Sequence, residues 1–313
     1  MRLPVPLLLA ALAALLLPAA AHAQTVVAAD PAAQQLTALA GSVVWSSAAE
    51  DGEVLMRRDE RGRVARVPRT PPARVYRSLD LGLDAGGELV LTYLRCSTFT
   101  RCVPYADDLR GTRKRVRGLE RDGCRLSTAP AMWRSTQAYG LVCRRGGRFD
   151  RRRSGLYAQT KRARPRRLPA PPRALGTGSL LVTSVDLRGS RAAAITADIN
   201  EYAYSVRTSG RGLQAFLAAT SEGDGNARAG GLALGSGDAL WTLVTSEHAG
   251  DPNEAVIFRS TGGCLGIERL ANASEQETGF RAVDIAVDGG TVYLVAPGTG
   301  ITTHAFAPER PCG

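Results

Sequence analysis

The strongest constraint on the fold of this chain is a β-hairpin pattern that recurs along its whole length. Two copies are very similar in pattern: residues 78–94 read SLDLGLDAGGELVLTYL, and residues 282–296 read AVDIAVDGGTVYLVA. Each has apolar residues at alternate positions, a turn containing Gly-Gly and a second apolar run, which predicts two strands joined by a tight turn. Four further copies stand at 36–47, 133–144, 184–198 and 231–246.

The spacing of these copies is nearly constant. The midpoints of their second strands are 47, 49, 54, 47 and 52 residues apart, at Val43, Val90, Tyr139, Ala193, Leu240 and Val292. Polar turns recur between them, at 58–63, 120–124, 207–212 and 259–264, so each repeat holds two hairpins and four strands. Six four-stranded units and almost no helical periodicity predict an all-β, six-bladed β-propeller, in which each blade is stabilised by stacking on its neighbours.

This arrangement resembles the six-bladed propellers of the broad family that includes the TolB-like periplasmic proteins and the NHL-type propellers. The resemblance covers the chain from residue 24 onwards, but only as architecture, so no site residue follows from it. We expect one domain at 24–313, with blades at roughly 34–70, 77–130, 131–169, 179–220, 230–272 and 279–307. The segment 24–30 is the expected outer strand of the sixth blade and would close the ring. A β-sandwich or two smaller β domains is the alternative arrangement of the same strands.

The first 23 residues have the pattern of a signal peptide. Arg2 precedes an apolar run that is too short to span a membrane comfortably, and Ala21-His22-Ala23 matches a cleavage site. No later stretch is apolar for long enough to cross a bilayer. We therefore expect an exported protein, secreted or at the exterior of the cell envelope. Basic residues are 38 Arg and only 2 Lys, which is typical of a GC-rich bacterial genome.

Charge is distributed unevenly along the chain. Residues 101–173 contain 21 Lys and Arg against 5 Asp and Glu, whereas residues 174–313 contain 9 against 15. A basic surface on the second and third blades attracts polyanions, although codon usage alone also explains an Arg-rich surface. Long loops should share one face, around the mouth of the central channel. The candidate ligand-binding residues are Arg144, Arg145, Arg148, Arg151, Arg152, Arg153, Arg166 and Arg167.

Six cysteines in an exported chain favour disulfides. The blade pattern ranks Cys264–Cys312 first, because this bond would pin the C-terminus to the ring. Cys96–Cys102 comes second, because the two cysteines flank a five-residue loop. Cys124–Cys143 comes third, because the expected strand register places these two residues on opposite faces. Either that register is wrong or Cys143 pairs elsewhere, for instance with Cys102.

Catalytic and metal-binding motifs are weak. There is no Cys-x-x-Cys pair, no Gly-x-Ser-x-Gly motif, and only two His follow the expected leader, so we expect no metal site and no cofactor. Asp80, Asp186 and Asp284 recur at the same place in three repeats, which indicates a structural role, such as bonding to the neighbouring turn.

These observations favour a non-catalytic binding or envelope-interaction module without settling whether any catalysis occurs. An anionic envelope polymer is the expected partner. A hydrolase or lyase acting on an anionic polysaccharide and a scaffold for a protein partner are the alternatives. Nucleic acid is not expected, because aromatic residues are sparse in the basic run and the protein is exported.

Overall fold

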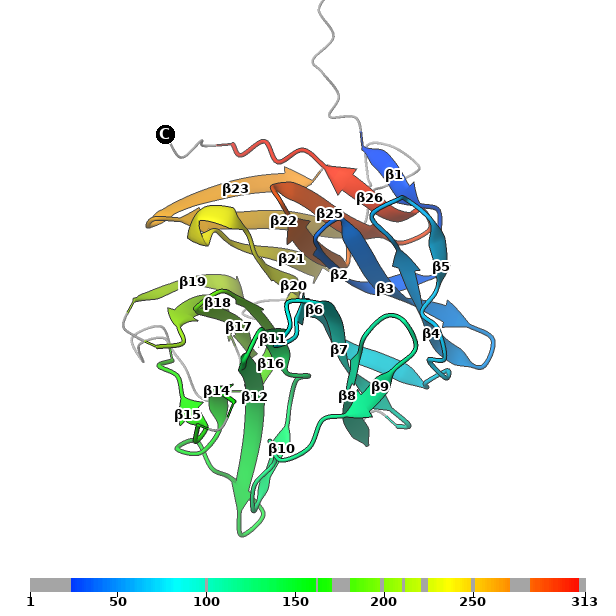
Figure 1. Ribbon diagram of the computed structural model, residues 1–313. Helices are drawn as coiled ribbons and strands as arrows, with labels where there is room; N and C mark the ends of the chain where they lie inside the picture. The colour runs from blue at the N-terminus through cyan, green and yellow to red at the C-terminus, as the bar shows by residue number, and fades with distance from the viewer. Residues whose placement is uncertain are drawn as a thin grey trace, which may run out of the picture.

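The computed structural model describes nine segments of the chain, which together contain all six repeats. They are residues 24–98, 101–161, 163–170, 181–197, 200–209, 212–220, 225–248, 251–270 and 282–309. The expected signal peptide at 1–23 lies outside the described residues. Within these segments strands dominate, there is no α-helix, and one short 3₁₀ turn occurs at Ser236–Asp238 (Figure 1). The predicted all-β fold class is confirmed.

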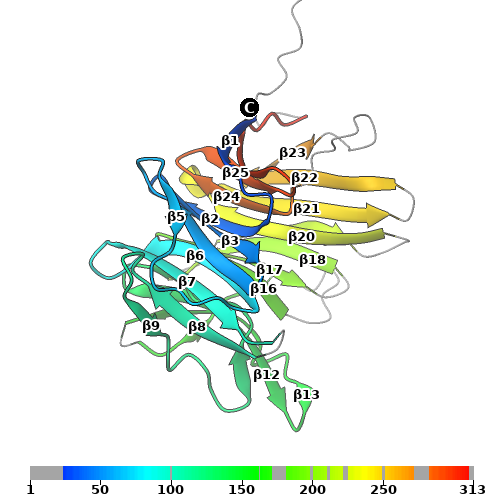
Figure 2. The same cartoon turned by 90° about the vertical axis from the view of Figure 1, so that its right-hand side faces the viewer.

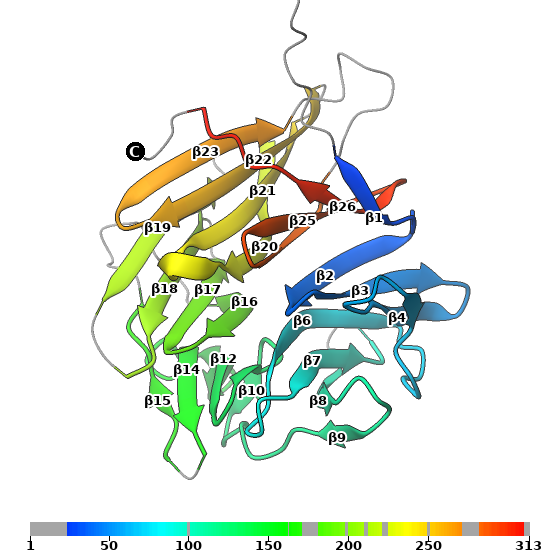
Figure 3. The same ribbon diagram turned by 45° about the horizontal axis from the view of Figure 1, so that its top comes forward.

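Six antiparallel groups of strands, here called blades one to six, stand around a common centre (Figure 3). Four blades are regular, and their strands are given from the centre outwards. Blade one has β2 (Ala33–Leu39), β3 (Ser42–Ala49), β4 (Gly52–Arg58) and β5 (Val64–Arg66). Blade two has β6 (Val75–Leu83), β7 (Leu89–Cys96), β8 (Cys102–Asp107) and β9 (Arg113–Arg115). Blade four has β16 (Leu181–Arg188), β17 (Arg191–Ala197), β18 (Asn200–Arg207) and β19 (Leu213–Thr220). Blade five has β20 (Gly225–Leu234), β21 (Leu240–His248), β22 (Asp251–Thr261) and β23 (Cys264–Leu270).

Blade three is irregular at its inner edge. Its main strands are β11 (Ala131–Trp133), β12 (Thr136–Arg145), β14 (Gly155–Thr160) and β15 (Arg166–Arg167). Two short strands, β10 (Cys124–Leu126) and β13 (Arg148–Phe149), also pair with β12. Because β10 and β11 lie on the same edge of β12, the inner strand of this blade is in two pieces. A parallel bridge from Trp133 to Leu83 of β6 joins blades two and three into one sheet.

The predicted boundary between the second and third repeats is wrong. The sequence pattern places Cys124 at the start of the fourth strand of blade two, whereas the structure pairs Cys124 with Cys143 at the inner edge of blade three. The true fourth strand, β9, reads Arg-Lys-Arg and is fully exposed. Such a strand carries no alternation of apolar and polar residues, so the pattern could not reveal it.

Blade six closes the ring with both ends of the chain. Its strands are β24 (Asp284–Asp288), β25 (Thr291–Ala296), β26 (Gly300–His304) and, outermost, β1 (Thr25–Ala28). The pairing of Thr25 with Thr303 and of Ala28 with Ile301 confirms the predicted closure by an N-terminal strand (Figure 3). The turn between β24 and β25 uses Gly289 and Gly290 at φ of 55° and 94°, where residues with a side chain are strained.

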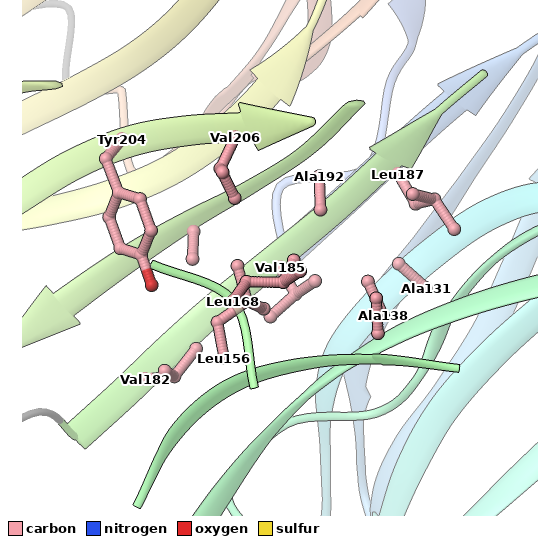
Figure 4. Close-up of a cluster of buried hydrophobic side chains, with 12 residues drawn as sticks. Ala131, Ala138, Leu156, Leu168, Val182, Val185, Leu187, Ala192, Tyr204 and Val206 are labelled. Carbon is pink, nitrogen blue, oxygen red and sulfur yellow. The ribbon is translucent and has the colours of Figure 1, made fainter. Parts of the chain in front are cut away.

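The hydrophobic core lies between the faces of neighbouring blades. Between blades three and four, small and branched residues such as Ala131, Ala138, Val182 and Leu187 interlock (Figure 4). Equivalent clusters fill the interfaces between blades one and two, four and five, five and six, and six and one. The alternating apolar residues of each strand therefore contact the next blade, which is the packing that the repeat predicts.

Successive strands alternate in direction, so loops fall on two faces of the ring. The loops from second to third strands and from one blade to the next share one face, here called the long-loop face. The remaining turns lie on the opposite face, here called the short-turn face. The hairpin of β12 and β13 projects well beyond the other blades (Figure 2).

Candidate functional site: a basic groove between blades two and three

The centre of the ring is narrow and crossed by one arginine. Arg188, at the end of β16, donates hydrogen bonds to the carbonyl oxygens of Leu81 (2.6 Å) and Ala38 (3.0 Å). Its guanidinium also lies 5.7 Å from the ring centre of Trp133. This side chain links blade four to blades one, two and three, and it contributes to closure of the ring at the short-turn end of the inner strands.

The three repeated aspartates hold neighbouring blades together. Asp80 accepts a hydrogen bond from the amide of Met132 (3.3 Å), Asp186 from that of Leu234 (2.6 Å) and Asp284 from that of Leu36 (2.8 Å). In each case the donor belongs to the inner strand of the next blade, so the structural interpretation of these residues is confirmed. The partner is a strand amide and not the neighbouring turn. Burial raises the pKa of Asp284 to about 7.

A groove of about 1760 Å³ opens on the long-loop face between blades two and three. Its walls come from the loop after β7, the connection from β9 to β10, and the ends of β10 and β12. Gln35, Ser78 and Thr183 line both this groove and the central cavity, so the groove leads to the mouth of the channel. We call this hollow the blade 2–3 groove.

Arginines stand on both walls of the groove. Arg77 and Arg101 belong to blade two, Arg121 to the connection that leads into blade three, and Arg125 and Arg144 to blade three itself. Two carboxylates, Glu120 and Asp122, reduce this charge, which leaves a formal net charge of +3 among the lining residues. Positive charge that faces a concave surface from two sides attracts an anionic chain more strongly than the same charge spread over a convex surface.

Part of the groove lining is aliphatic. It includes Leu94, Val103, Leu126, Val142 and Leu181, of which Leu181 is 38% exposed. No aromatic residue is among the described residues that line the groove. The site therefore offers charge and aliphatic surface but no ring on which a neutral sugar or a nucleobase could stack.

Two disulfides fix the walls of the groove. Cys96–Cys102 clamps the loop after β7 in blade two, and Cys124–Cys143 joins β10 to β12 in blade three. Cys102 and Cys124 themselves line the groove. Both predicted pairs are confirmed, and the unexpected register of Cys124 removes the objection to the second pair. Cys264 is disulfide-bonded, but Cys312 lies outside the described residues, so their pairing stays a prediction.

Only one of the eight predicted binding arginines, Arg144, lines the groove. Three others bond to backbone carbonyl oxygens: Arg153 to that of Asp122, Arg166 to that of Thr208, and Arg167 to that of Ser154. These contacts hold loops in place.

The other four predicted arginines are exposed on the projecting hairpin and the loop that follows it: Arg145, Arg148, Arg151 and Arg152. The structure does not bring the predicted set together into one site.

Sequence reasoning missed four of the groove arginines: Arg77, Arg101, Arg121 and Arg125. Three of them lie inside the basic segment 101–173, so the charge excess indicated the correct region. The choice of residues failed because it followed the densest run of arginines, whereas the groove is assembled from loops that are distant in sequence.

Metal and membrane signals are absent from the part of the chain that the structure describes. No group of three or more His, Cys, Asp or Glu side chains is placed to hold a metal ion there. No helix in the same segments is long and apolar enough to cross a membrane. The side chains of Glu247, His248 and Asp251, the other polar cluster of the sequence, are not among those described.

Comparison with known proteins finds structures of similar shape but no related family. No family model matches the chain, and no curated protein matches it. The structure of an arginine-to-alanine triple mutant of AofleA from Arthrobotrys oligospora aligns with 91% of this chain and 86% of its own, at 11% identity and a TM-score of 0.53.

Two other solved structures are also similar. The fungal lectin from Aleuria aurantia, described as a six-bladed β-propeller with a novel fucose recognition mode, covers 90% of this chain and 98% of its own, at 11% identity and a TM-score of 0.49. The β-propeller domain of the trilobed protease from Pyrococcus furiosus covers 90% and 86%, at 10% identity and 0.48. At such low identity, structural similarity does not extend to a ligand, and the propeller fold rests on the strand arrangement described above.

Proposed function

We propose that this protein is an exported, non-catalytic binding module that holds an anionic polymer, such as an acidic polysaccharide of the cell envelope, in the blade 2–3 groove. The observation that carries the proposal is the placement of arginines on both walls of one groove on the long-loop face. A guanidinium matches the planar fork of a carboxylate, a sulfate or a phosphate and keeps its charge at any physiological pH.

The chemistry of the groove favours an acidic chain over a neutral sugar. Recognition of neutral sugars commonly uses the apolar face of the ring against an aromatic side chain, and none lines this groove among the described residues. The aliphatic lining residues, such as Leu126 and Leu181, can contact the carbon skeleton of a polymer while the arginines contact its acidic groups. The disulfides at Cys102 and Cys124 keep the two walls fixed, which lowers the entropy lost on binding.

Charge reversal in the groove tests the proposal directly. Arg101 and Arg125 are exposed, belong to blades two and three respectively, and form no ion pair with another described residue, so Arg101→Glu with Arg125→Glu should leave the fold intact. Two lost charge-assisted contacts at a partly exposed site correspond to about 2 kcal/mol, so binding to heparin or alginate should weaken about 30-fold. Arg61→Glu with Arg164→Glu is the matched control. It changes the net charge equally, but on the short-turn face.

Affinity is measured on immobilised heparin, alginate and neutral dextran over a series of salt concentrations. We expect wild type and the control to be retained on both acidic resins and to pass through dextran, and the groove variant to elute at lower salt. Equal weakening in both variants would show that only net charge matters and would contradict the groove site. Release of new reducing ends from alginate during the incubation would favour the hydrolase or lyase alternative instead.

A further inference from the structure

A second polar cavity lies at the centre of the ring, between the mouth of the blade 2–3 groove and Arg188. It has a volume of about 140 Å³ and is lined by the inner strands β2, β6, β16, β20 and β24. Three carboxyl groups face it, from Asp80, Asp186 and Asp284. Arg188 is the only basic residue among the described residues that line it. The centre therefore carries more acidic than basic groups, the reverse of the groove.

The three carboxyl groups differ in how many hydrogen bonds their oxygen atoms accept. Asp284 accepts a hydrogen bond at each oxygen, from the amides of Leu36 and Ile285, both at 2.8 Å. Asp186 is only 4% exposed; its Oδ2 accepts from Leu234, while no donor among the described residues bonds to its Oδ1. The nearest cation, Nε of Arg188, is 3.8 Å from that oxygen, beyond hydrogen-bonding distance.

Asp80 adds a second acidic group next to Asp186. It is 4% exposed, and its one backbone donor, the amide of Met132, stands at 3.3 Å. Burial and the neighbouring Asp186 raise the pKa of Asp80 well above its ordinary value. Arg188 is the one cation close to this pair, and a protonated Asp80 can donate a hydrogen bond to Asp186. The buried pair therefore has few hydrogen-bond donors and less positive than negative charge, which is an unfavourable arrangement unless something supplies more of both.

We infer that this central cavity binds the ammonium group of a primary amine, held between Asp80 and Asp186. A primary ammonium brings one more positive charge and three N–H donors, and this carboxyl pair is short of both. A metal ion fits less well, because no group of three His, Cys, Asp or Glu side chains among the described residues is placed to hold one. The site goes beyond the proposed function and does not depend on it. If the groove binds a polymer, an amine on that polymer has a route from the groove to the channel mouth along Gln35, Ser78 and Thr183.

The binding should depend on pH. The charged groups that face the cavity are Asp80 from β6, Asp186 and Arg188 from β16, and Asp284 from β24, whereas the described lining of β2 and β20 is uncharged. Because burial favours the protonated form of Asp80 in the empty cavity, an entering ammonium releases a proton. Affinity should therefore rise with pH as Asp80 loses its proton more readily, over the range in which the amine itself stays charged.

The test uses methylammonium chloride as the probe, with sodium chloride and tetramethylammonium chloride as controls of equal charge that have no N–H donors. At ten times its dissociation constant, methylammonium should raise the melting temperature of the wild-type protein by about 2 °C relative to either control. Calorimetry in phosphate and in HEPES should show release of a proton on binding. Equal shifts with all three salts would indicate an ionic-strength effect and would overturn the site.

Substitution of one carboxyl group separates binding from folding. Asp186→Asn keeps an oxygen for the Leu234 amide and puts an NH₂ group in place of the unpartnered oxygen, so it should melt cooperatively and lose the methylammonium response. Asp80→Asn should behave in the same way, and it replaces Asp186→Asn in this test if that variant does not fold. A retained response in either folded variant would overturn the site. The groove proposal is tested separately, because none of these measurements uses a polymer.

Discussion

One carboxylate between β1 and β2 reinforces the closure of the ring. Asp30 lies between β1 and β2 and accepts three hydrogen bonds: from Nε1 of Trp45 at 2.6 Å, from the hydroxyl of Ser47 at 3.0 Å and from the amide of Ala32 at 3.1 Å. Trp45 is fully buried in the interface between blades one and six. The outer strand of blade six is thereby connected to the core of blade one.

Replacement of this carboxylate should be costly. Asp30→Ala leaves the buried indole N–H of Trp45 without an acceptor, for about 1–3 kcal/mol, and removes two further bonds worth about 0.5–1 kcal/mol each. We therefore expect a loss of about 3 kcal/mol in the free energy of unfolding. For residues 24–313, an unfolding entropy of about 0.6 kcal/mol/K turns this loss into a fall of about 5 °C in melting temperature.

Urea and thermal unfolding of three variants check the reasoning. Asp30→Asn keeps an oxygen acceptor for Trp45 and should lose only about 1 kcal/mol. Asp59→Ala is the control, because Asp59 also accepts three hydrogen bonds, from Arg61 and Arg63, but in an exposed turn where water replaces them. If Asp30→Ala were no more destabilising than Asp59→Ala, the connection at Trp45 would not stabilise the ring and the argument would fail.

Three further predictions concern closure, titration and the third disulfide. Deletion of residues 24–31 exposes the unpaired edge of β26, so the protein should aggregate or melt at a much lower temperature, and unchanged stability would refute closure by β1. Because burial raises the pKa of Asp284 to about 7 from an ordinary 3.8, the folded state keeps a proton that the unfolded chain loses. The free energy of unfolding of wild type, relative to that of Asp284→Asn, should therefore fall by up to about 4 kcal/mol as the pH rises from about 4 to about 7. If the stabilities of the two proteins changed with pH in parallel, this titration would be refuted. Mass spectrometry of unreduced peptides should find Cys264 linked to Cys312; a link from Cys264 to an upstream cysteine would be incompatible with the blade order.

Much of the architecture could be predicted because short stretches of sequence determine it. The turn at Gly289 and Gly290 and the alternation around it mark a hairpin on their own, and repetition of that hairpin gives the number of blades. The closing strand followed from the need of blade six for a fourth strand. Similarly, Cys96 and Cys102 flank a loop so short that their pairing needs no knowledge of the rest of the fold.

The irregular blade and the groove could not be predicted in the same way. The inner strand of blade three is split into β10 and β11, and β9 is a charged strand, so the repeat pattern misplaced Cys124. The groove joins Arg77, Arg101 and Arg125 from three separate segments, and only the packing of blade three against blade two brings them together. Runs of arginine in sequence therefore indicated the basic region without indicating which guanidinium groups share a surface.

Chemical footprinting of arginines tests the binding groove most directly. Phenylglyoxal modifies accessible guanidinium groups, and mass spectrometry can compare each arginine in the presence and absence of saturating alginate or heparin. We predict that the polymer protects Arg101, Arg125 and Arg144, while Arg61 and Arg164 on the short-turn face react as before. Protection confined to the projecting hairpin and the loop after it, at Arg145, Arg148, Arg151 and Arg152, with the groove arginines still reactive, would contradict the proposed site.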